Sequence, residues 1–479
     1  MPLTEEQQAI VESPADLLKV KAFAGTGKTF TLVEYAKARP KEPMLYLAFN
    51  RSIRREAERK FPKNVTCLTS HAPAYRSIGV AYKDKLVEDS RPREWVEALR
   101  LDRIVAAGES YLLAHQALQC LKNWLASDRE ALDERSIVPL RRGTSPFADS
   151  LVVATANDGW QRMVDHADSA VGMTHDGYLK LYQLSKPVWP YQRILFDEAQ
   201  DANPVTTDLV LRQRAHKVFV GDPHQQIYGF RGADDALEKL NAEETLYLSG
   251  SWRFGPHVAG IANVLLARFK GETVRVKGLG GADEIASVDR QQPHTILCRG
   301  NASIFTAAIA NMDAHPHFVG GINGYRLDRL LSAHDLRVGE SVRDPYLASF
   351  RDWQEFSDIA ETTDDREALS LIRICERYQD GLPGLIGAVR RNASPTPQGA
   401  GVTLSTGHKA KGLEWDQVRL ASDFPDLLDE EQAPAQAGDL EDEEINLIYV
   451  AATRAKRRLE PYAGLTDFLI QLARERQAQ

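Results

Sequence analysis

Apolar residues occur along this chain in two patterns: short continuous runs, and stretches with the three-to-four spacing of amphipathic helices. Short apolar runs predict buried strands at residues 17–23, 44–49, 193–196 and 217–220. The first two runs are each followed by a helical pattern, which is the order expected in a parallel α/β domain. Residues 94–127 and 149–170 have almost purely helical spacing, which predicts a helical insertion inside that domain.

The same alternation of strands and helices returns in the second half of the chain. Strand patterns are found there at residues 245–248, 295–297, 401–404 and 417–421. A less regular stretch separates them and contains helical patches such as residues 367–378. We therefore predict an α/β fold with two domains, each interrupted by a mainly helical insertion. The expected boundaries are 1–71 with 186–250 for the first domain, 72–185 for its insertion, 251–322 with 399–479 for the second domain and 323–398 for its shorter insertion.

The length and composition of the chain agree with this division. A chain of 479 residues is longer than one hydrophobic core usually organises. Its 43% hydrophobic and 26% charged residues are typical of a soluble globular protein and exclude a disordered or fibrous one. The net charge of −8 gives no global sign of a nucleic-acid binder, so a nucleic-acid site would have to be a local basic groove.

Four cysteines, at positions 67, 120, 298 and 375, lie far apart and show no CxxC spacing. This argues against a structural zinc site or a disulfide framework and favours a reducing, intracellular setting. The N-terminus has no basic segment followed by an apolar one, and no apolar run approaches the length that spans a membrane. We expect a cytoplasmic protein with no membrane contact.

The segment VKAFAGTGKT, which ends at Thr29, follows an apolar run and precedes a helical pattern. In this context Gly25 and Gly27 let the backbone curl so that successive N–H groups point at phosphate oxygens, and the helix adds its positive end. Lys28 can then reach the β- and γ-phosphates, and the Thr29 hydroxyl can bind Mg²⁺. Ala22 occupies the position of the usual first glycine, so the strict motif is broken there. The pattern predicts a nucleotide-binding loop rather than a plain glycine turn before a core helix.

A second candidate site follows the apolar strand ILF, where residues 197–201 read DEAQD. The carboxyl ends of parallel strands face the ligand crevice, so Asp197 would lie beside the phosphate loop and hold Mg²⁺, directly or through water. Glu198 would orient or deprotonate the attacking water, since phosphoryl transfer mainly needs positioning and charge neutralisation. Acidic residues after a strand more often form an N-cap and a solvated turn, but the phosphate loop upstream favours the catalytic interpretation.

Further segments with chemical character extend from one end of the chain to the other. In order they are LTEEQ (3–7), LAFNR (47–51), TCLTSHA (66–72), VFVGDPHQQIYGFRGA (218–233), LSGSWR (248–253), ILCRGN (296–301), TGHKAKGLEW (406–415) and EEINLIYVAATRA (443–455). With the two sites above, they resemble the motif set of superfamily 1 helicases of the UvrD/Rep/PcrA type. Their wording looks closest to the F-box DNA helicase branch, without an F-box here. The resemblance covers the two insertions least.

The resemblance implies two RecA-like domains that close on one ATP, with the insertions as subdomains 1B and 2B. The residues that it places around ATP and Mg²⁺ are Gln7, Ala24, Gly25, Thr26, Gly27, Lys28, Thr29, Asp197, Glu198, Gln225, Trp252, Arg253, Glu414 and Arg454. Arg253 and Arg454 would act as arginine fingers, which a planar and always charged guanidinium suits. Gln225 would contact the γ-phosphate, and Glu414 would bind the ribose.

The same resemblance implies how the base and the DNA are bound. Gln7 would read adenine through its amide, which can both donate and accept, and Trp252 would stack on the base. Single-stranded DNA would be held by aromatic side chains that stack on bases and by polar groups that follow the phosphates. The positions implied are Phe49, Asn50, Arg51, Thr69, His71, Tyr228, Phe230, Arg231 and His408. For Tyr228 and Phe230 ordinary core packing is the alternative.

The function implied is that of an ATP-dependent DNA helicase or translocase that moves on single-stranded DNA, with 3′→5′ polarity. Expected partners are single-stranded DNA or a junction of single and double strands; we expect a monomer when free, and the sequence does not identify a loading partner. Two alternatives stay open: a translocase that displaces DNA-bound proteins without unwinding, and a nucleotide-switched subunit of a larger repair, plasmid, phage or defence assembly. An RNA track is a further alternative. A nuclease–helicase fusion is disfavoured, because the chain ends soon after the last motif.

Overall fold

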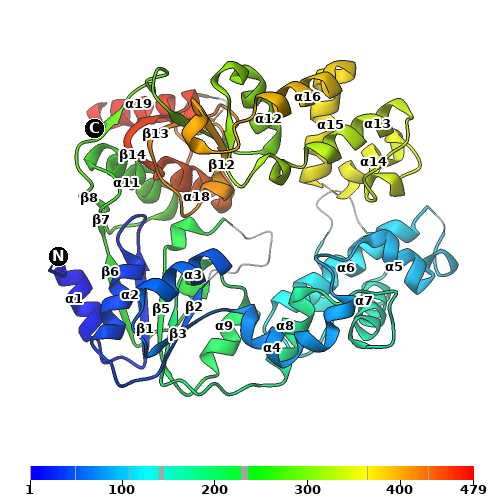
Figure 1. The fold of residues 1–479 in the computed structure, drawn as a ribbon, viewed down its shortest axis with the longest axis horizontal. Helices are drawn as coiled ribbons and strands as arrows, with labels where there is room; N and C mark the ends of the chain where they lie inside the picture. The colour runs from blue at the N-terminus through cyan, green and yellow to red at the C-terminus, as the bar shows by residue number, and fades with distance from the viewer. Residues whose placement is uncertain are drawn as a thin grey trace. The chain divides into compact units, whose positions relative to one another are not determined.

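The computed structural model describes residues 2–48, 50–106, 108–139, 145–227, 236–363, 365–429 and 431–478. The chain forms two compact units, the first from residues 1–22 and 28–248 and the second from residues 23–27 and 249–479. Each unit contains a six-stranded sheet in which the paired strands run parallel, flanked by helices (Figure 1). This confirms the predicted α/β class, and it is the arrangement that the resemblance implies for two RecA-like domains.

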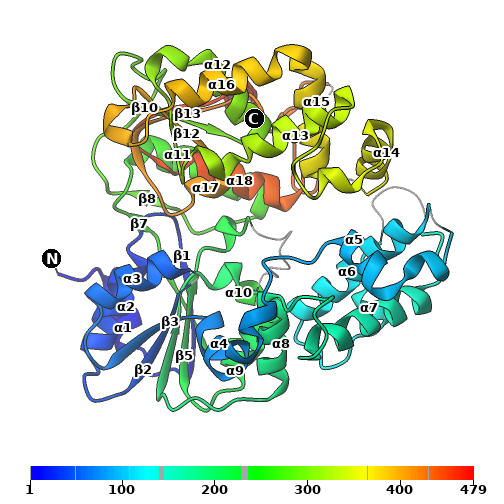
Figure 2. The same ribbon diagram turned by 45° about the vertical axis from the view of Figure 1, so that its right-hand side comes forward.

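The sheet of the first unit has the strand order β3-β2-β4-β5-β1-β6. Its strands are β1 (Leu17–Ala22), β2 (Met44–Ala48), β3 (Val65–Thr69), β4 (Arg193–Phe196), β5 (His216–Gly221) and β6 (Glu244–Leu248). Figure 2 shows α1 (Glu5–Glu12), α2 (Lys28–Lys37) and α3 (Arg51–Lys60) on one face and α9 (Pro204–Leu211) on the other. Every residue of β2 and β4 is buried, as expected for strands covered on both faces.

Alternate residues of β2 belong to different cores. Met44 and Tyr46 pack in one cluster with Ile10 of α1 and Leu32 of α2. Leu45 and Leu47 pack in the other cluster, on the side of α9. The two-residue period of the strand thus directs the Tyr46 side chain towards the face that carries α2 and the phosphate loop.

The helical insertion of the first unit contains α4 (His71–Ser77), α5 (Pro92–Leu99), α6 (Ser110–Ala126), α7 (Asp149–Val164) and α8 (His175–Leu184), of which α5, α6 and α7 are seen at the right of Figure 1. The almost purely helical stretch predicted over 94–127 is present, but it is divided between α5 and α6. Helix α5 stops at Leu99 because Arg100 adopts a left-handed backbone with φ of 53°, and a short 3₁₀ turn follows. Ile104, an apolar residue in the segment between α5 and α6, is 55% exposed. The helix predicted over 149–170 is real but ends at Val164.

The sheet of the second unit has the strand order β11-β12-β10-β13-β14-β9. Its strands are β9 (Glu284–Ile285), β10 (His294–Cys298), β11 (His317–Phe318), β12 (Val402–Thr406), β13 (Trp415–Leu420) and β14 (Ala455–Glu460). The flanking helices include α11 (Pro256–Lys270), α12 (Asn301–Ala310), α17 (Gly407–Ala410), α18 (Asp442–Ala452) and α19 (Ala463–Ala478). A small pair, β7 (Gly250–Ser251) and β8 (Lys277–Gly278), stands apart from the sheet.

Within residues 323–398 the second unit forms α13 (Leu327–Val338), α14 (Trp353–Thr363), α15 (Arg366–Tyr378) and α16 (Leu382–Asn392). The helical patch expected at 367–378 therefore corresponds to α15. The domain and insertion boundaries given above stay predictions. No helix in the described ranges is long and apolar enough to cross a membrane.

Candidate nucleotide-binding site

The turn between β1 and α2 requires its two glycines. Gly25 and Gly27 have φ of 75° and 81°, a left-handed conformation that residues with a Cβ rarely adopt. A Cβ placed on Gly25 would lie 2.6 Å from Oγ of Ser251, so this position also lacks space. The Thr26 hydroxyl closes the turn by donating to the carbonyl of Phe23 at 2.8 Å. The missing first glycine has a simple reason, because residue 22 is the buried last residue of the strand.

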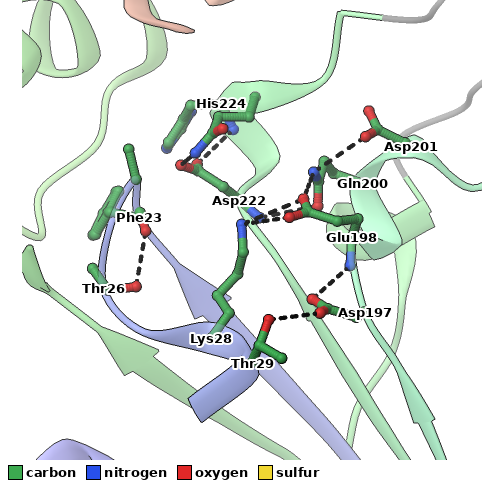
Figure 3. A network of polar contacts seen from close by, with 12 residues as sticks. Phe23, Thr26, Lys28, Thr29, Asp197, Glu198, Gln200, Asp201, Asp222 and His224 are labelled. Atoms are coloured by element: carbon green, nitrogen blue, oxygen red, sulfur yellow. Dashed lines mark hydrogen bonds and ion pairs between the residues drawn. The ribbon is translucent and has the colours of Figure 1, made fainter. Parts of the chain in front are cut away.

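Lys28, the first residue of α2, lies against the acidic end of β4 (Figure 3). Its Nζ is 3.2 Å from Oε1 of Glu198 and 3.3 Å from Oε2. Burial by itself would lower the pKa of Lys28, but the carboxylates of Glu198, Asp222 and Asp197 together raise it above its ordinary value. Lys28 is therefore a fixed positive charge at the phosphate loop.

Asp197 receives three hydrogen bonds from three different segments. Its Oδ2 accepts from the Thr29 hydroxyl at 3.3 Å and from the Tyr46 hydroxyl at 2.7 Å, and its Oδ1 accepts from the backbone N–H of Glu198 at 2.9 Å. Burial and the neighbouring Glu198 charge raise the pKa of Asp197, while Lys28 opposes that rise. A hydroxyl and a carboxylate side by side are the hard oxygen donors that Mg²⁺ prefers, so these residues fit the predicted metal site.

Glu198 has a strained backbone at the centre of this network. Its φ of 53° and ψ of 41° place it in the left-handed region, which is uncommon for a residue with a long side chain. The side chain is held between Lys28 and Gln200, whose Nε2 donates to Oε2 of Glu198 at 2.6 Å. The fully buried Gln200 also accepts the backbone N–H of Asp222 at 3.1 Å and so ties the end of β4 to the end of β5.

Gln225 lies in the turn that follows β5. Its Nε2 donates to Oδ2 of Asp222 at 2.7 Å, and it is only 4% exposed. The Asp222 charge also helps to raise the pKa of Lys28, so the Asp222 carboxylate links Gln225 to the lysine of the phosphate loop. Sequence reasoning missed Tyr46 and Gln200. A hydroxyl inside an otherwise apolar strand and an amide between two acids are the signals that could have revealed them.

Residues 23–27, which group with the second unit, contact two of its segments. The Trp252 N–H donates to the carbonyl of Gly25 at 2.9 Å, and the N–H of Ala24 donates to the hydroxyl of the buried Tyr449 at 3.2 Å. The Trp252 side chain is 45% exposed, so its ring is accessible for stacking. These contacts link the loop to the start of the second unit and to α18.

Each of the two candidate arginine fingers is held by contacts within the second unit. The Nε of Arg253 is 2.9 Å from Oε2 of Glu414, and its Nη1 donates to the carbonyl of Thr453 at 3.3 Å. Arg454 is 1% exposed, and it donates to the carbonyls of Val450 at 2.9 Å and of residue 413 at 3.2 Å. Arg253 and Glu414, given separate roles by the resemblance, thus form an ion pair.

Three of the other predicted residues lie at the starts of helices. Gln7 is in a capping box at the start of α1, where its Oε1 accepts the N–H of Thr4 at 3.1 Å. Asn50 caps α3 by accepting the N–H of Ile53 at 2.9 Å, and the exposed Arg51 follows it.

The remaining DNA candidates are distributed over both units. Thr69 ends β3, and His71 begins α4 with its Nε2 3.4 Å from Oδ1 of Asp176. Strands β2 and β3 are neighbours in register, so the DNA candidates after them lie at one edge of the first sheet. His408 is the second residue of α17 in the second unit, with its Nε2 4.0 Å from Oε1 of Glu443. Phe49, Tyr228, Phe230 and Arg231 lie outside the described residues.

Comparison with known proteins gives matches in both units. The UvrD/REP helicase N-terminal domain matches residues 183–244, and the UvrD-like helicase C-terminal domain matches residues 350–460. F-box DNA helicase 1 of Gallus gallus is 33% identical over 520 residues, which cover 99% of this chain and 50% of the relative. F-box DNA helicase protein 1 of Schizosaccharomyces pombe is 33% identical over 507 residues, 95% of this chain and 57% of the relative. ATP-dependent DNA helicase UvrD2 of Mycobacterium tuberculosis is 27% identical over 56% of this chain and 47% of the relative.

This chain spans about half the length of the curated relatives it matches. The two domain matches nevertheless include the acidic end of β4, the turn after β5 and the segment that carries Arg454. The chain therefore belongs to the UvrD-like helicases of superfamily 1 and carries the N-terminal and C-terminal domains of that family.

Proposed function

We propose that this chain hydrolyses ATP in the presence of Mg²⁺ and uses the reaction to move along single-stranded DNA in the 3′→5′ direction. The observation that carries the proposal is the contact of Lys28 with Glu198, beside Thr29 and Asp197. A lysine after a glycine turn, a hydroxyl and two carboxylates are the groups that bind and cleave a γ-phosphate. The relatives are named DNA helicases, and one is named ATP-dependent, which supports the choice of nucleotide and polymer.

The ion pair between Lys28 and Glu198 gives an order of events. When Lys28 binds a phosphate oxygen, its hold on Glu198 weakens, and the freed carboxylate can accept a hydrogen bond from the attacking water. Gln200 then keeps Glu198 in place, because its amide donates to the same carboxylate. Thr29 and Asp197 would hold the Mg²⁺ ion, which neutralises charge on the phosphate oxygens. Phosphoryl transfer needs mostly this positioning and neutralisation.

Arg253 and Arg454 keep the proposed role of stabilising the charge that develops in the transition state. Each guanidinium is already oriented by backbone carbonyls, so little side-chain entropy is lost when it acts. The accessible Trp252 ring keeps the role of stacking on the base. Asn50, Arg51, Thr69, His71 and His408 keep the proposed role of contacting DNA.

The proposal is tested by measuring ATP hydrolysis with and without single-stranded DNA across a salt series. We expect strong stimulation by DNA that weakens as salt rises, since phosphate contacts release counterions. Glu198→Gln and Lys28→Ala should both abolish turnover, while Glu198→Gln should still bind nucleotide. Turnover that ignores DNA, or that survives in both variants, would refute the proposal and favour a nucleotide-switched interaction protein.

A second assay separates the remaining alternatives. Duplexes with a 3′ tail, a 5′ tail or a streptavidin block are offered to the wild type in the presence of ATP. Unwinding from the 3′ tail alone supports the proposed polarity. Displacement of streptavidin without strand separation would assign the chain to the protein-stripping translocases, and preference for a matched RNA strand would reassign the track.

A further inference from the structure

A groove of about 350 Å³ lies along the outer edge of β3 in the first unit. One wall is formed by Arg54 and Glu58 of α3, and Arg76 of α4 also lines the groove. The turn between α3 and β3 contributes Lys63, and the strand itself contributes the floor around Cys67. None of these residues belongs to the nucleotide site described above.

The floor of the groove offers a backbone donor. Within the described ranges β3 pairs only with β2, so its other edge is open. The N–H of Met44 donates to the carbonyl of Asn64 at 2.9 Å, which fixes the register of this parallel pair. In that register the amides of residues 66 and 68 point towards β2, and those of Val65 and Cys67 point outwards. The N–H of Val65 turns back to the carbonyl of Pro62 at 3.1 Å, so the outward amide that is left is that of Cys67, which lies with its carbonyl at the open edge lining the groove.

The walls of the groove are positively charged. Residues 51–76 contain seven Lys or Arg and two Glu, a local charge of +5 in a chain whose net charge is −8. Lys63 and Arg76 are exposed, and neither forms an ion pair with any residue that the structure describes. Arg54 forms an ion pair with Glu58 at 2.8 Å, so the cations of the groove that have no ion-pair partner among the described residues are Lys63 and Arg76. Such a concentration of positive charge attracts a polyanion.

The groove suits a phosphate backbone better than exposed bases. Phe61 is its only aromatic lining residue, and that ring packs against Tyr46 at a centroid distance of 4.6 Å, so it is not a stacking platform. Proteins bind phosphates without reading sequence by means of flexible cations and backbone N–H groups, and this groove offers both but no accessible ring. Binding of a single strand commonly uses rings on which unpaired bases stack, so a groove without an accessible ring suits a double strand, whose bases already stack on one another.

We propose that this groove binds the sugar–phosphate backbone of duplex nucleic acid adjoining the single-stranded track. The proposal rests on the proposed function. Helix α3 connects the two places: Asn50 and Arg51, candidates for the track, stand at its start, and the groove lies along its later turns and the edge of β3. A nucleic acid that branches from the track would therefore meet the groove on the same unit.

The test compares two ligands and two variants. The double variant Lys63→Glu/Arg76→Glu reverses both uncommitted cations, and Lys41→Glu reverses an exposed lysine of the same unit outside the groove. Fluorescence anisotropy across a salt series measures binding of a short single strand and of the same strand with a duplex arm. We expect the double variant to bind the armed ligand at least about tenfold more weakly and the slope of log K against log salt to fall by about 2, one for each lost phosphate contact. The short single strand and Lys41→Glu should behave as wild type.

Each other outcome has a definite meaning. Equal affinity of wild type and double variant for the armed ligand would overturn the inference, and so would an equal loss on the short single strand, which would make the groove part of the track. If a labelled poly-glutamate peptide binds the wild type and not the double variant, while duplex affinity is unchanged, the groove binds an acidic peptide instead. Failure of single-stranded DNA to stimulate wild-type ATP hydrolysis would refute the proposed function, a result independent of the comparison between variants.

Discussion

Replacing Tyr46 by Phe should impair the use of Mg²⁺ while leaving the fold intact. The Tyr46 hydroxyl is buried and donates from β2 to Oδ2 of Asp197 at 2.7 Å, the same oxygen that accepts from Thr29. Removing it takes away one of the three donors, so the carboxylate is held less firmly by the two that remain. The pKa of Tyr46 is raised well above its ordinary value by burial and then by the Asp197 charge, so the hydroxyl stays protonated and able to donate.

The size of the effect follows from the charge of the acceptor. A hydrogen bond to a charged group contributes about 1.5–3 kcal/mol, and loss of a partner that orients a metal ligand costs about 10–100-fold in metal affinity. We therefore expect the Mg²⁺ concentration that half-saturates nucleotide binding to rise at least about tenfold in Tyr46→Phe. Binding of the nucleotide without metal should change little, because Lys28 and the loop glycines do not contact the Tyr46 hydroxyl.

The measurement is titration of Mg²⁺ against binding of a fluorescent ATP analogue, with thermal unfolding recorded for each variant. Tyr35→Phe is the matched control. It removes a buried hydroxyl of the same unit, one that accepts a hydrogen bond from Arg193 at 2.8 Å. An unchanged Mg²⁺ requirement in Tyr46→Phe, or an equal change in Tyr35→Phe, would refute the reasoning and reduce Tyr46 to a packing residue.

Three further substitutions test separate parts of the structure. Gly25→Ala should abolish nucleotide binding, measured with the same fluorescent analogue, because a Cβ there would lie 2.6 Å from Oγ of Ser251 on a backbone with φ of 75°; normal affinity would show that the loop relaxes freely. Arg454→Ala should still bind ATP but hydrolyse it about 10³-fold or more slowly, as loss of an arginine finger does, and a small loss would show that the residue only packs. Lys180→Met should lower the free energy of unfolding by about 2–4 kcal/mol, measured by denaturant titration. The fully buried ammonium group donates to two carbonyls, one of them that of Ser127 at 2.9 Å, and both carbonyls would lose their partner. An unchanged midpoint would contradict this.

Most strands of the two sheets could be predicted because their apolar runs are local in the sequence, but β3, β9, β11 and β14 were not predicted. Strands β2 and β4 are buried at every position, and a short, mainly apolar run is the pattern that predicts such a strand. Strand β14 escaped prediction because its sequence is AKRRLE, with burial at only its first and fifth residues. The break after α5 was missed for another reason. Arg100 adopts a left-handed backbone although it is neither glycine nor asparagine, so its residue type gave no sign that the helix ends there.

The charged residues that the structure brings together at the candidate site each belong to a short motif, so they could be singled out from the sequence. Their hydrogen-bond donors could not, because those donors come from elsewhere in the fold. Tyr46 precedes Asp197 by about 150 residues in the chain, and only the pairing of β2 with β4 brings them together. Gln200 was visible in the motif, but its second bond, to the Asp222 amide, depends on the pairing of β4 with β5.

The balance of charge in this site explains why metal and nucleotide should bind together. Asp197, Glu198 and Asp222 surround a single cation, Lys28, so the cluster carries an excess of negative charge when all three acids are ionised. Asp222 is fully buried and Asp197 is 3% exposed, and burying like charges costs free energy unless a cation balances them. A nucleotide without metal adds further negative charge to this cluster, whereas one that arrives with Mg²⁺ adds less and supplies a cation. If the site binds ATP as proposed, we therefore expect this arrangement of carboxylates to favour the metal-bound nucleotide over the free one before any step of hydrolysis.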